Sequence, residues 1–138
     1  MTSRRWLTSL LVVAASLSAG CSARAAAGPP DPVTVDVRIH YSRFEPAQIE
    51  VPAGTPVTFV LRNDDFIDHE FIVGDERVQA RHETGTEPAH GARTDEVDVP
   101  AGATVTTKVT FARPGTLVYA CHVPGHFAYG MAGTLTVH

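Results

Sequence analysis

Residues 119–137 read Tyr-Ala-Cys-His-Val-Pro-Gly-His-Phe-Ala-Tyr-Gly-Met-Ala-Gly-Thr-Leu-Thr-Val, a loop between two apolar runs that carries Cys121, His126 and Met131. Cys121 is the only cysteine apart from Cys21 near the N-terminus, and Met131 is the only methionine apart from the first residue. A thiolate, an imidazole and a thioether are soft to intermediate metal donors. Three such donors on one short loop predict a metal site.

This donor set selects copper. Two histidines, one cysteine and a weak axial methionine form the ligand set of type 1 (blue-copper) electron-transfer sites. The loop lacks the second imidazole, and His69, in Asp68-His69-Glu70-Phe71, is the best upstream candidate. We therefore expect one copper ion held between His69 and this loop.

Residues 1–20 have the features of a signal peptide. Arg4 and Arg5 give a positive N-terminal region, and residues 7–17 form an apolar run that is too short for a permanent membrane span. We therefore expect an exported protein, located in the periplasm or cell envelope.

The end of this leader, Leu17-Ser-Ala-Gly-Cys21, is typical of a lipoprotein cleavage site, which predicts that Cys21 is lipidated and tethers the protein to the membrane. Ser18 departs from the usual leucine, so cleavage at a small-residue site such as Ala23-Arg24-Ala25 is the alternative. Residues 21–32 are rich in Ala, Gly and Pro and predict a flexible tether. The folded domain is then residues 33–138.

The charge of the chain limits its partners. The net charge is −4, and removal of residues 1–20 takes away two arginines and leaves −6. Nucleic acid is excluded as a partner by that charge. Redox partner proteins, steered by charge, are the expected partners, with membrane contact only through the lipid anchor. We expect a monomer.

Cys121 has no disulfide partner if Cys21 is lipidated or removed with the leader. A buried structural thiol is one interpretation, and a catalytic thiol with His126 as base is another. Neither explains Met131 on the same loop. A metal ligand is therefore the preferred interpretation.

The remaining sequence predicts an all-β domain. Apolar and polar residues alternate with period two in three segments, and short apolar segments bounded by Gly and Pro turns lie between them. Phe44-Glu45-Pro46 is expected to break the first strand. About seven to eight strands without a long helix predict a β-sandwich. The expected strands are 33–39, 49–51, 57–61, 71–73, 96–99, 105–111, 117–121 and 135–137.

The segment 74–95 shows no sustained period. It is predicted to be a long loop or insertion, with one short helical turn around Glu76–Arg81 as an option. His82 and His90 lie in this segment and are expected to be solvated. A second, weaker copper site that uses both is the alternative.

The motif Cys121-x4-His126-x4-Met131, followed by Ala-Gly-Thr-Leu-Thr-Val, resembles the ligand loop of the cupredoxins, the type 1 blue-copper family. Phe44-Glu-Pro, Val51-Pro-Ala-Gly and His69-Glu-Phe also resemble the bacterial exported, plastocyanin- or rusticyanin-like members. The resemblance implies a Greek-key β-sandwich with His69, Cys121 and His126 as equatorial ligands and Met131 as the axial ligand. It also implies an apolar surface at the edge of His126, formed by Pro124 and Phe127.

Several other polar residues need an interpretation. His122 is expected to be a loop or surface residue, because a wire to a trinuclear copper cluster would need His-x-His pairs that this chain lacks. His40 and His138 are expected to be solvated. Asp64, Asp65 and Asp68 form a solvated turn or, as a sharper hypothesis, an acidic docking patch.

Two functions fit these residues. The first is an electron carrier that cycles between Cu(I) and Cu(II), and the second is a periplasmic copper-binding protein for copper tolerance or delivery. No second metal centre or catalytic constellation is visible in the sequence, so we do not expect an enzyme. A metal-free adhesion or structural β-sandwich would leave Cys121, His126 and Met131 unexplained.

Overall fold

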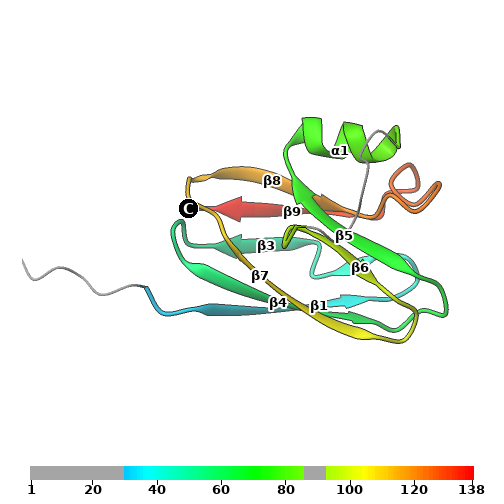
Figure 1. Ribbon diagram of the computed structural model, residues 1–138, viewed down its shortest axis with the longest axis horizontal. Coiled ribbons are helices and arrows are strands. Elements are labelled where there is room, and N and C mark those ends of the chain that lie inside the picture. The colour runs from blue at the N-terminus through cyan, green and yellow to red at the C-terminus, as the bar shows by residue number, and fades with distance from the viewer. Residues whose placement is uncertain (1–29, 86–92) are drawn as a thin grey trace, which may run out of the picture.

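The computed structural model describes residues 30–85 and 93–138. Within these ranges nine strands and one helix form a two-sheet sandwich (Figure 1). The expected signal peptide, Cys21 and most of the tether lie outside the described residues, as does His90.

One sheet has the strand order β2-β1-β4-β7 and the other has the order β3-β9-β8-β5-β6. The all-β sandwich expected from the sequence is therefore confirmed. Two pairs, β1 with β4 and β3 with β9, are parallel, and the remaining pairs are antiparallel. The elements are β1 (Val33–Ile39), β2 (Phe44–Glu45), β3 (Gln48–Val51), β4 (Pro56–Asn63), β5 (His69–Gly74), α1 (Glu76–Glu83), β6 (Glu96–Val99), β7 (Thr104–Thr110), β8 (Gly115–Ala120) and β9 (Ala132–Val137).

Period-two alternation creates the core. In β4 the residues Val57, Phe59 and Leu61 are fully buried, while the residues between them face outward. Across the sandwich Phe71 and Tyr119 meet these side chains, with the Phe59 and Phe71 ring centroids 5.3 Å apart. Burial of aromatic surface of this kind is a large favourable contribution to folding.

The two similar Pro-Ala-Gly turns have the geometry that their glycines predict. Gly54 and Gly102 adopt φ values of +71° and +67°, a left-handed conformation that is unfavourable for other residues. Each turn leads directly into a strand, the first into β4 and the second into its neighbour β7, so the local sequence fixes where these two strands begin.

Phe44-Glu45-Pro46 was expected only to interrupt a strand. It instead contributes the two-residue strand β2, which pairs with the end of β1, so the count is nine rather than seven or eight. Phe44 also enters the core, where its ring lies 5.4 Å from the ring of Tyr119.

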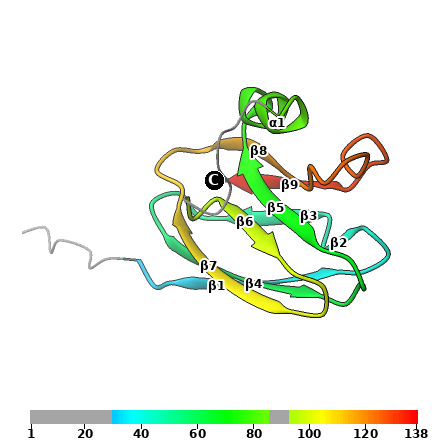
Figure 2. The ribbon, with the colours of Figure 1, turned by 45° about the vertical axis from the view of Figure 1, so that its right-hand side comes forward.

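The segment after Gly74 contains a complete helix. Asp75 caps α1 by accepting a hydrogen bond from the Val78 N–H at 3.0 Å, and Glu76 and Arg81 place charges that suit the helix dipole. The helix lies on the outer face of the five-stranded sheet, over β5 and β8 (Figures 1 and 2). The helical turn considered from the sequence is thus confirmed and extends to Glu83.

Helix α1 approaches the sheet closely because Gly74 has no side chain. A Cβ at that position would lie 2.4 Å from the Cβ of Val78. The helix buries Ile72 and Ala120 on the outer face of the sheet, which explains why 71–73 is apolar without alternation. None of the helices in the described ranges is long and apolar enough to cross a membrane.

The loop between β8 and β9, the start of β5 and the loop between β4 and β5 lie at the same end of the sandwich (Figure 2). This arrangement follows from the antiparallel pairing of β8 with β5, which places the end of one strand beside the start of the other. Residues 69 and 121, far apart in the sequence, are thereby brought together.

Candidate metal centre

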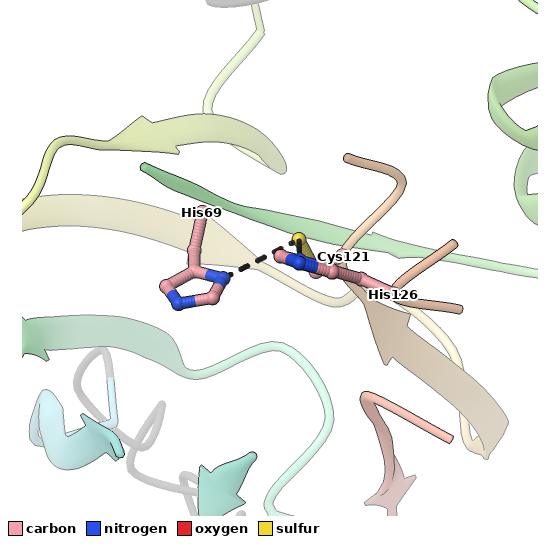
Figure 3. A group of neighbouring side chains, drawn as sticks. All are labelled: His69, Cys121 and His126. Carbon is pink, nitrogen blue, oxygen red and sulfur yellow. Dashed lines mark hydrogen bonds between the residues drawn. The ribbon is translucent and has the colours of Figure 1, made fainter. Parts of the chain in front are cut away.

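The structure brings His69, Cys121 and His126 into one cluster. One donor atom from each lies within 4.8 Å of the others, and this is the single such group of histidine, cysteine and acidic residues in the described ranges. The Sγ of Cys121 lies 3.8 Å from Nδ1 of His69 and 3.3 Å from Nδ1 of His126. Figure 3 shows the three side chains turned toward a shared point.

Each donor is placed by a different part of the frame. His69 is the first residue of β5, Cys121 directly follows β8, and His126 lies in the loop that returns to β9. The loop is closed by backbone hydrogen bonds from His126 N–H to the Val123 carbonyl and from Met131 N–H to the His126 carbonyl, both at 2.9 Å. The site is therefore organised by the backbone.

Met131, the expected axial ligand, is 1% exposed and belongs to the same buried cluster as Cys121. Its carbonyl accepts a hydrogen bond from the Cys121 N–H at 3.2 Å. All four expected ligands thus lie at one end of the core.

The thiol of Cys121 receives a hydrogen bond that supports a thiolate. The backbone N–H of Glu70 donates to Sγ at 3.3 Å, and the Glu70 carboxylate accepts from the backbone N–H of His122 at 3.0 Å. Glu70, which directly follows the ligand His69, thereby contacts both Cys121 and His122.

Burial shapes the protonation of the two loop ligands. It raises the pKa of the Cys121 thiol, an effect that the N–H groups of Glu70 and Val123 oppose. Burial, and then the neighbouring His69, lower the pKa of His126. A metal ion must therefore displace a proton from sulfur but meets a neutral imidazole at His126.

Asp65 accepts a hydrogen bond at Oδ2 from Nε2 of His69 at 2.9 Å. Asp65 and Glu70 are the two polar contacts of the site that the sequence analysis missed. The signal for Asp65 was its position four residues before His69, and the signal for Glu70 was its direct adjacency to the ligand. Neither position alone reveals which atom it contacts.

The expectation of a solvated His82 is wrong, and His122, which lies in a loop as expected, has a buried side chain. His82 is 5% exposed on the inner side of α1, because the expected loop is a helix that packs on the sheet. The His122 side chain is 1% exposed, and its ring nitrogens face Glu83 Oε2 at 2.9 Å and Gln79 Oε1 at 2.7 Å. The two rings lie 5.6 Å apart, outside the donor cluster.

His138 is exposed, as expected, whereas His40 is only partly exposed, at 27% of its side chain, because its ring packs against Tyr41. Within the ligand loop Pro124 is exposed, and Phe127 is partly buried against the ring of His122, with centroids 4.8 Å apart. Phe66, fully exposed, adds an apolar group at this end that the sequence analysis did not include.

The three aspartates of the β4–β5 loop form ion pairs or hydrogen bonds within the chain. Asp64 forms ion pairs with Arg38 and Arg62 at 2.6 and 2.9 Å, and Asp68 accepts a hydrogen bond from the Ala101 N–H at 2.9 Å. Their carboxylates are thus engaged within the chain. Docking through them stays a prediction.

The cluster fits copper. Two imidazole nitrogens and one sulfur converge in a buried place, and the second nitrogen of His69 is occupied by a carboxylate that orients the ring. The family model described as a Cupredoxin-like domain matches residues 9–137. The chain belongs to the cupredoxin family. Its donor set is that of one type 1 copper ion, with His69, Cys121, His126 and Met131 as the residues that would hold it.

Two relatives support this assignment. The "Copper-resistant cuproprotein CopI" of Rubrivivax gelatinosus is 36% identical over 98 residues, which are 69% of this chain and 59% of that protein. The protein of the same name from Pseudomonas aeruginosa is 31% identical over 136 residues and is matched over 75% of each chain. This cupredoxin thus spans less than two thirds of the Rubrivivax relative.

Solved structures show the same fold. Auracyanin B superposes with a TM-score of 0.66 at 25% identity, covering 82% of this chain and 92% of the other. Rusticyanin from Thiobacillus ferrooxidans gives a TM-score of 0.59 at 19% identity and covers 81% of this chain and 79% of its own. The resemblance expected from the ligand loop is confirmed for the whole cupredoxin domain.

Proposed function

We propose that this cupredoxin is an exported carrier of single electrons. The observation that supports it best is the buried, ordered donor cluster: His69 and Cys121 are 1% and 0% exposed, and backbone hydrogen bonds hold the loop that carries His126. Copper, when bound there, supplies a one-electron Cu(I)/Cu(II) couple. A frame that holds its ligands fixed limits the rearrangement that accompanies a change of oxidation state.

His126 is the contact point with a redox partner in this proposal. It is the one member of the cluster that is partly exposed. Exposed Pro124 and Phe66 provide apolar surface at the same end. Such a surface fits a short-lived complex with a redox partner protein, in which the edge of the His126 ring faces the partner.

The test compares electron exchange with metal loss. The purified protein receives one equivalent of copper and is cycled between ferrocyanide and ferricyanide in the presence of a Cu(I)-specific chelator. We expect an intense thiolate-to-copper band that bleaches and returns over repeated cycles, with copper retained. Transfer of copper to the chelator on the first reduction would contradict the carrier function.

Copper tolerance or delivery is the second candidate, and the names of the two CopI relatives favour it. The two functions are not exclusive, because an electron carrier can serve copper tolerance by changing the oxidation state of copper. Deletion of the gene separates them. Sensitivity to added copper without a respiratory defect supports tolerance, and a respiratory defect at low copper supports general electron transport.

Export, and a tether through lipidated Cys21, complete the proposal. The leader sequence supports both, and mass spectrometry of the protein from membranes distinguishes a diacylglyceryl Cys21 from a free N-terminus near Ala25. We propose a monomer without enzymatic activity, because one redox metal that is held by four side chains offers no substrate site of its own.

A further inference from the structure

Asp65 is held by hydrogen bonds at each of its polar groups. Its N–H donates to Asn63 Oδ1 at 3.0 Å, and its carbonyl accepts from the Gly102 N–H at 3.2 Å. Its side chain is 13% exposed, and its two oxygens accept from the N–H groups of Tyr41 and Ser42, each at 2.8 Å. The carboxylate is therefore fixed independently of any metal.

The turn that holds this carboxylate is unusual. Tyr41 and Ser42 both have φ of +51°, a left-handed conformation that costs about 1–3 kcal/mol for each non-glycine residue. Successive N–H groups in such a turn point into one concave site, which favours an anion. Asp65 is the anion that occupies this site, so the connection between β1 and β2 serves as its support.

The same carboxylate determines which nitrogen of His69 carries the proton. An ionised carboxylate accepts hydrogen bonds and does not donate them, so Nε2 of His69, 2.9 Å from Asp65 Oδ2, carries the hydrogen. The lone pair is then on Nδ1, which lies 3.8 Å from the Sγ of Cys121. The ring is thus in the tautomer, and in the orientation, that a copper ion needs.

Three donors surround the Asp65 carboxylate, namely the N–H groups of Tyr41 and Ser42 and Nε2 of His69. Hydrogen bonds donated to a carboxylate favour its charged form. The negative charge therefore lies directly beside the His69 side chain, which is fully buried. A negative charge that is hydrogen-bonded to a ligating imidazole makes the imidazole a stronger donor.

We propose that Asp65 is a positioning residue that fixes His69 in the ligating tautomer and stabilises oxidised over reduced copper. This inference rests on the copper function proposed above. The stabilisation follows because added electron density on the imidazole, and a nearby negative charge, favour Cu(II) more than Cu(I).

Loss of a partner of this kind typically lowers metal affinity by about 10–100-fold. If the affinity for Cu(II) falls tenfold more than the affinity for Cu(I), the reduction potential rises by about 59 mV, the value for a one-electron couple. The expected direction in a variant without the carboxylate is therefore a more positive potential.

The experiment uses Asp65→Asn, which keeps the shape, with Asp64→Asn as the matched control. Asp64 is the adjacent carboxylate and pairs with Arg38 and Arg62, so its substitution removes one negative charge without touching His69. The Ser42 N–H and His69 share Oδ2, whereas the Tyr41 N–H binds Oδ1, so in Asp65→Asn the amide oxygen can take only one of these two places. In the orientation that puts the amide NH2 in the place of Oδ2, the NH2 faces His69 and favours a proton on Nδ1.

The first readout is the tautomer of His69 by nitrogen NMR of the metal-free protein. We expect the Nε2–H form in the wild type and in Asp64→Asn, and a mixed or Nδ1–H form in Asp65→Asn. This readout does not require copper. A wild type without a type 1 copper spectrum would contradict the proposed function, while the tautomer would still decide whether Asp65 positions His69.

The second readout is the affinity for Cu(II) and for Cu(I), with the reduction potential. We expect Asp65→Asn to bind Cu(II) more weakly and to have a more positive reduction potential. The copper affinities of Asp64→Asn should stay within about twofold of those of the wild type. An unchanged tautomer and unchanged affinities in Asp65→Asn, or an equal shift in Asp64→Asn, would overturn the proposal. If Asp65→Asn alone does not fold, Ser42→Gly is introduced into both the wild type and Asp65→Asn. Glycine adopts the left-handed conformation of residue 42 without strain, so the same measurements become possible.

Discussion

Two pairs of histidines lie next to each other in the part of the chain that the structure describes, and of these two pairs one has the geometry to hold a metal. His69 and His126 have ring centroids 5.0 Å apart, and each directs Nδ1 toward the sulfur of Cys121. His82 and His122 have centroids 5.6 Å apart, but the nitrogens of His122 face Glu83 and Gln79 on α1. Proximity of imidazoles is therefore not enough, and convergence of donor atoms on a thiolate makes the difference.

The contrast is sharpest within the loop itself. His122 follows Cys121 directly, yet its ring turns to the helix, while His126 returns to the sulfur because the loop closes back through Val123 and Met131. We expect the first pair, His69 and His126, to determine copper binding. We expect the second pair, His82 and His122, to determine how α1 is attached to the sheet. Four predictions test this division, in order of their expected effect on copper.

The largest effect is expected for Cys121→Ser. A hydroxyl cannot replace the thiolate, so the intense charge-transfer band and the narrow copper hyperfine splitting should disappear completely. Visible absorption and paramagnetic resonance spectra measure both, with His122→Ala as the neighbouring control that keeps them. A pale spectrum that is the same in wild type and Cys121→Ser would show that Cys121 is not a ligand and would favour a site that uses His82 and His90.

His126→Ala should lower the affinity for Cu(II) by at least about 100-fold, above the range typical of outer-sphere partners. Because His126 is partly exposed, added imidazole should enter the vacated position and restore the band. Competition titrations with and without imidazole measure this effect. Equal losses in His126→Ala and His122→Ala would remove the distinction between the two pairs.

Copper affinity should fall as the pH falls. Burial raises the pKa of Cys121, so the thiol is protonated at neutral pH, whereas the lowered pKa of His126 keeps that imidazole neutral there. Binding then releases one proton from sulfur, and the affinity should drop about tenfold per pH unit below the thiol pKa. A pH-stat titration counts the proton, and His122→Ala should give the same slope. Uptake without proton release would show that the resting group is already a thiolate.

Gln79→Ala should destabilise the fold with little effect on copper. The Gln79 amide donates to the Ile72 and Val118 carbonyls at 3.2 and 2.9 Å and faces His122, and unsatisfied buried groups cost about 1–3 kcal/mol. Urea denaturation of the metal-free protein measures the loss, and Arg77→Ala on the exposed face of α1 is the control. A changed copper spectrum in Gln79→Ala would mean that the second pair also positions the ligand loop.

Much of this architecture is local in the sequence and was therefore predictable. The three long strands β1, β4 and β7 are recognisable by alternation over a few residues, and Gly54 and Gly102 mark turns that require a left-handed backbone conformation. Helix α1 was harder, because its apolar signal is weak and its inner face carries Gln79 and His82, polar residues that are buried only because the sheet covers them.

The sequence by itself determined the chemistry of the site, since Cys121, His126 and Met131 share one short loop and their donor atoms select copper. It also determined the β-sandwich, through side-chain periodicity. Only the tertiary structure decided that Asp65 orients His69 and that His122 turns away to α1. These contacts depend on strand register and on chain segments far apart in the sequence, and no local pattern encodes the direction in which a side chain finally points.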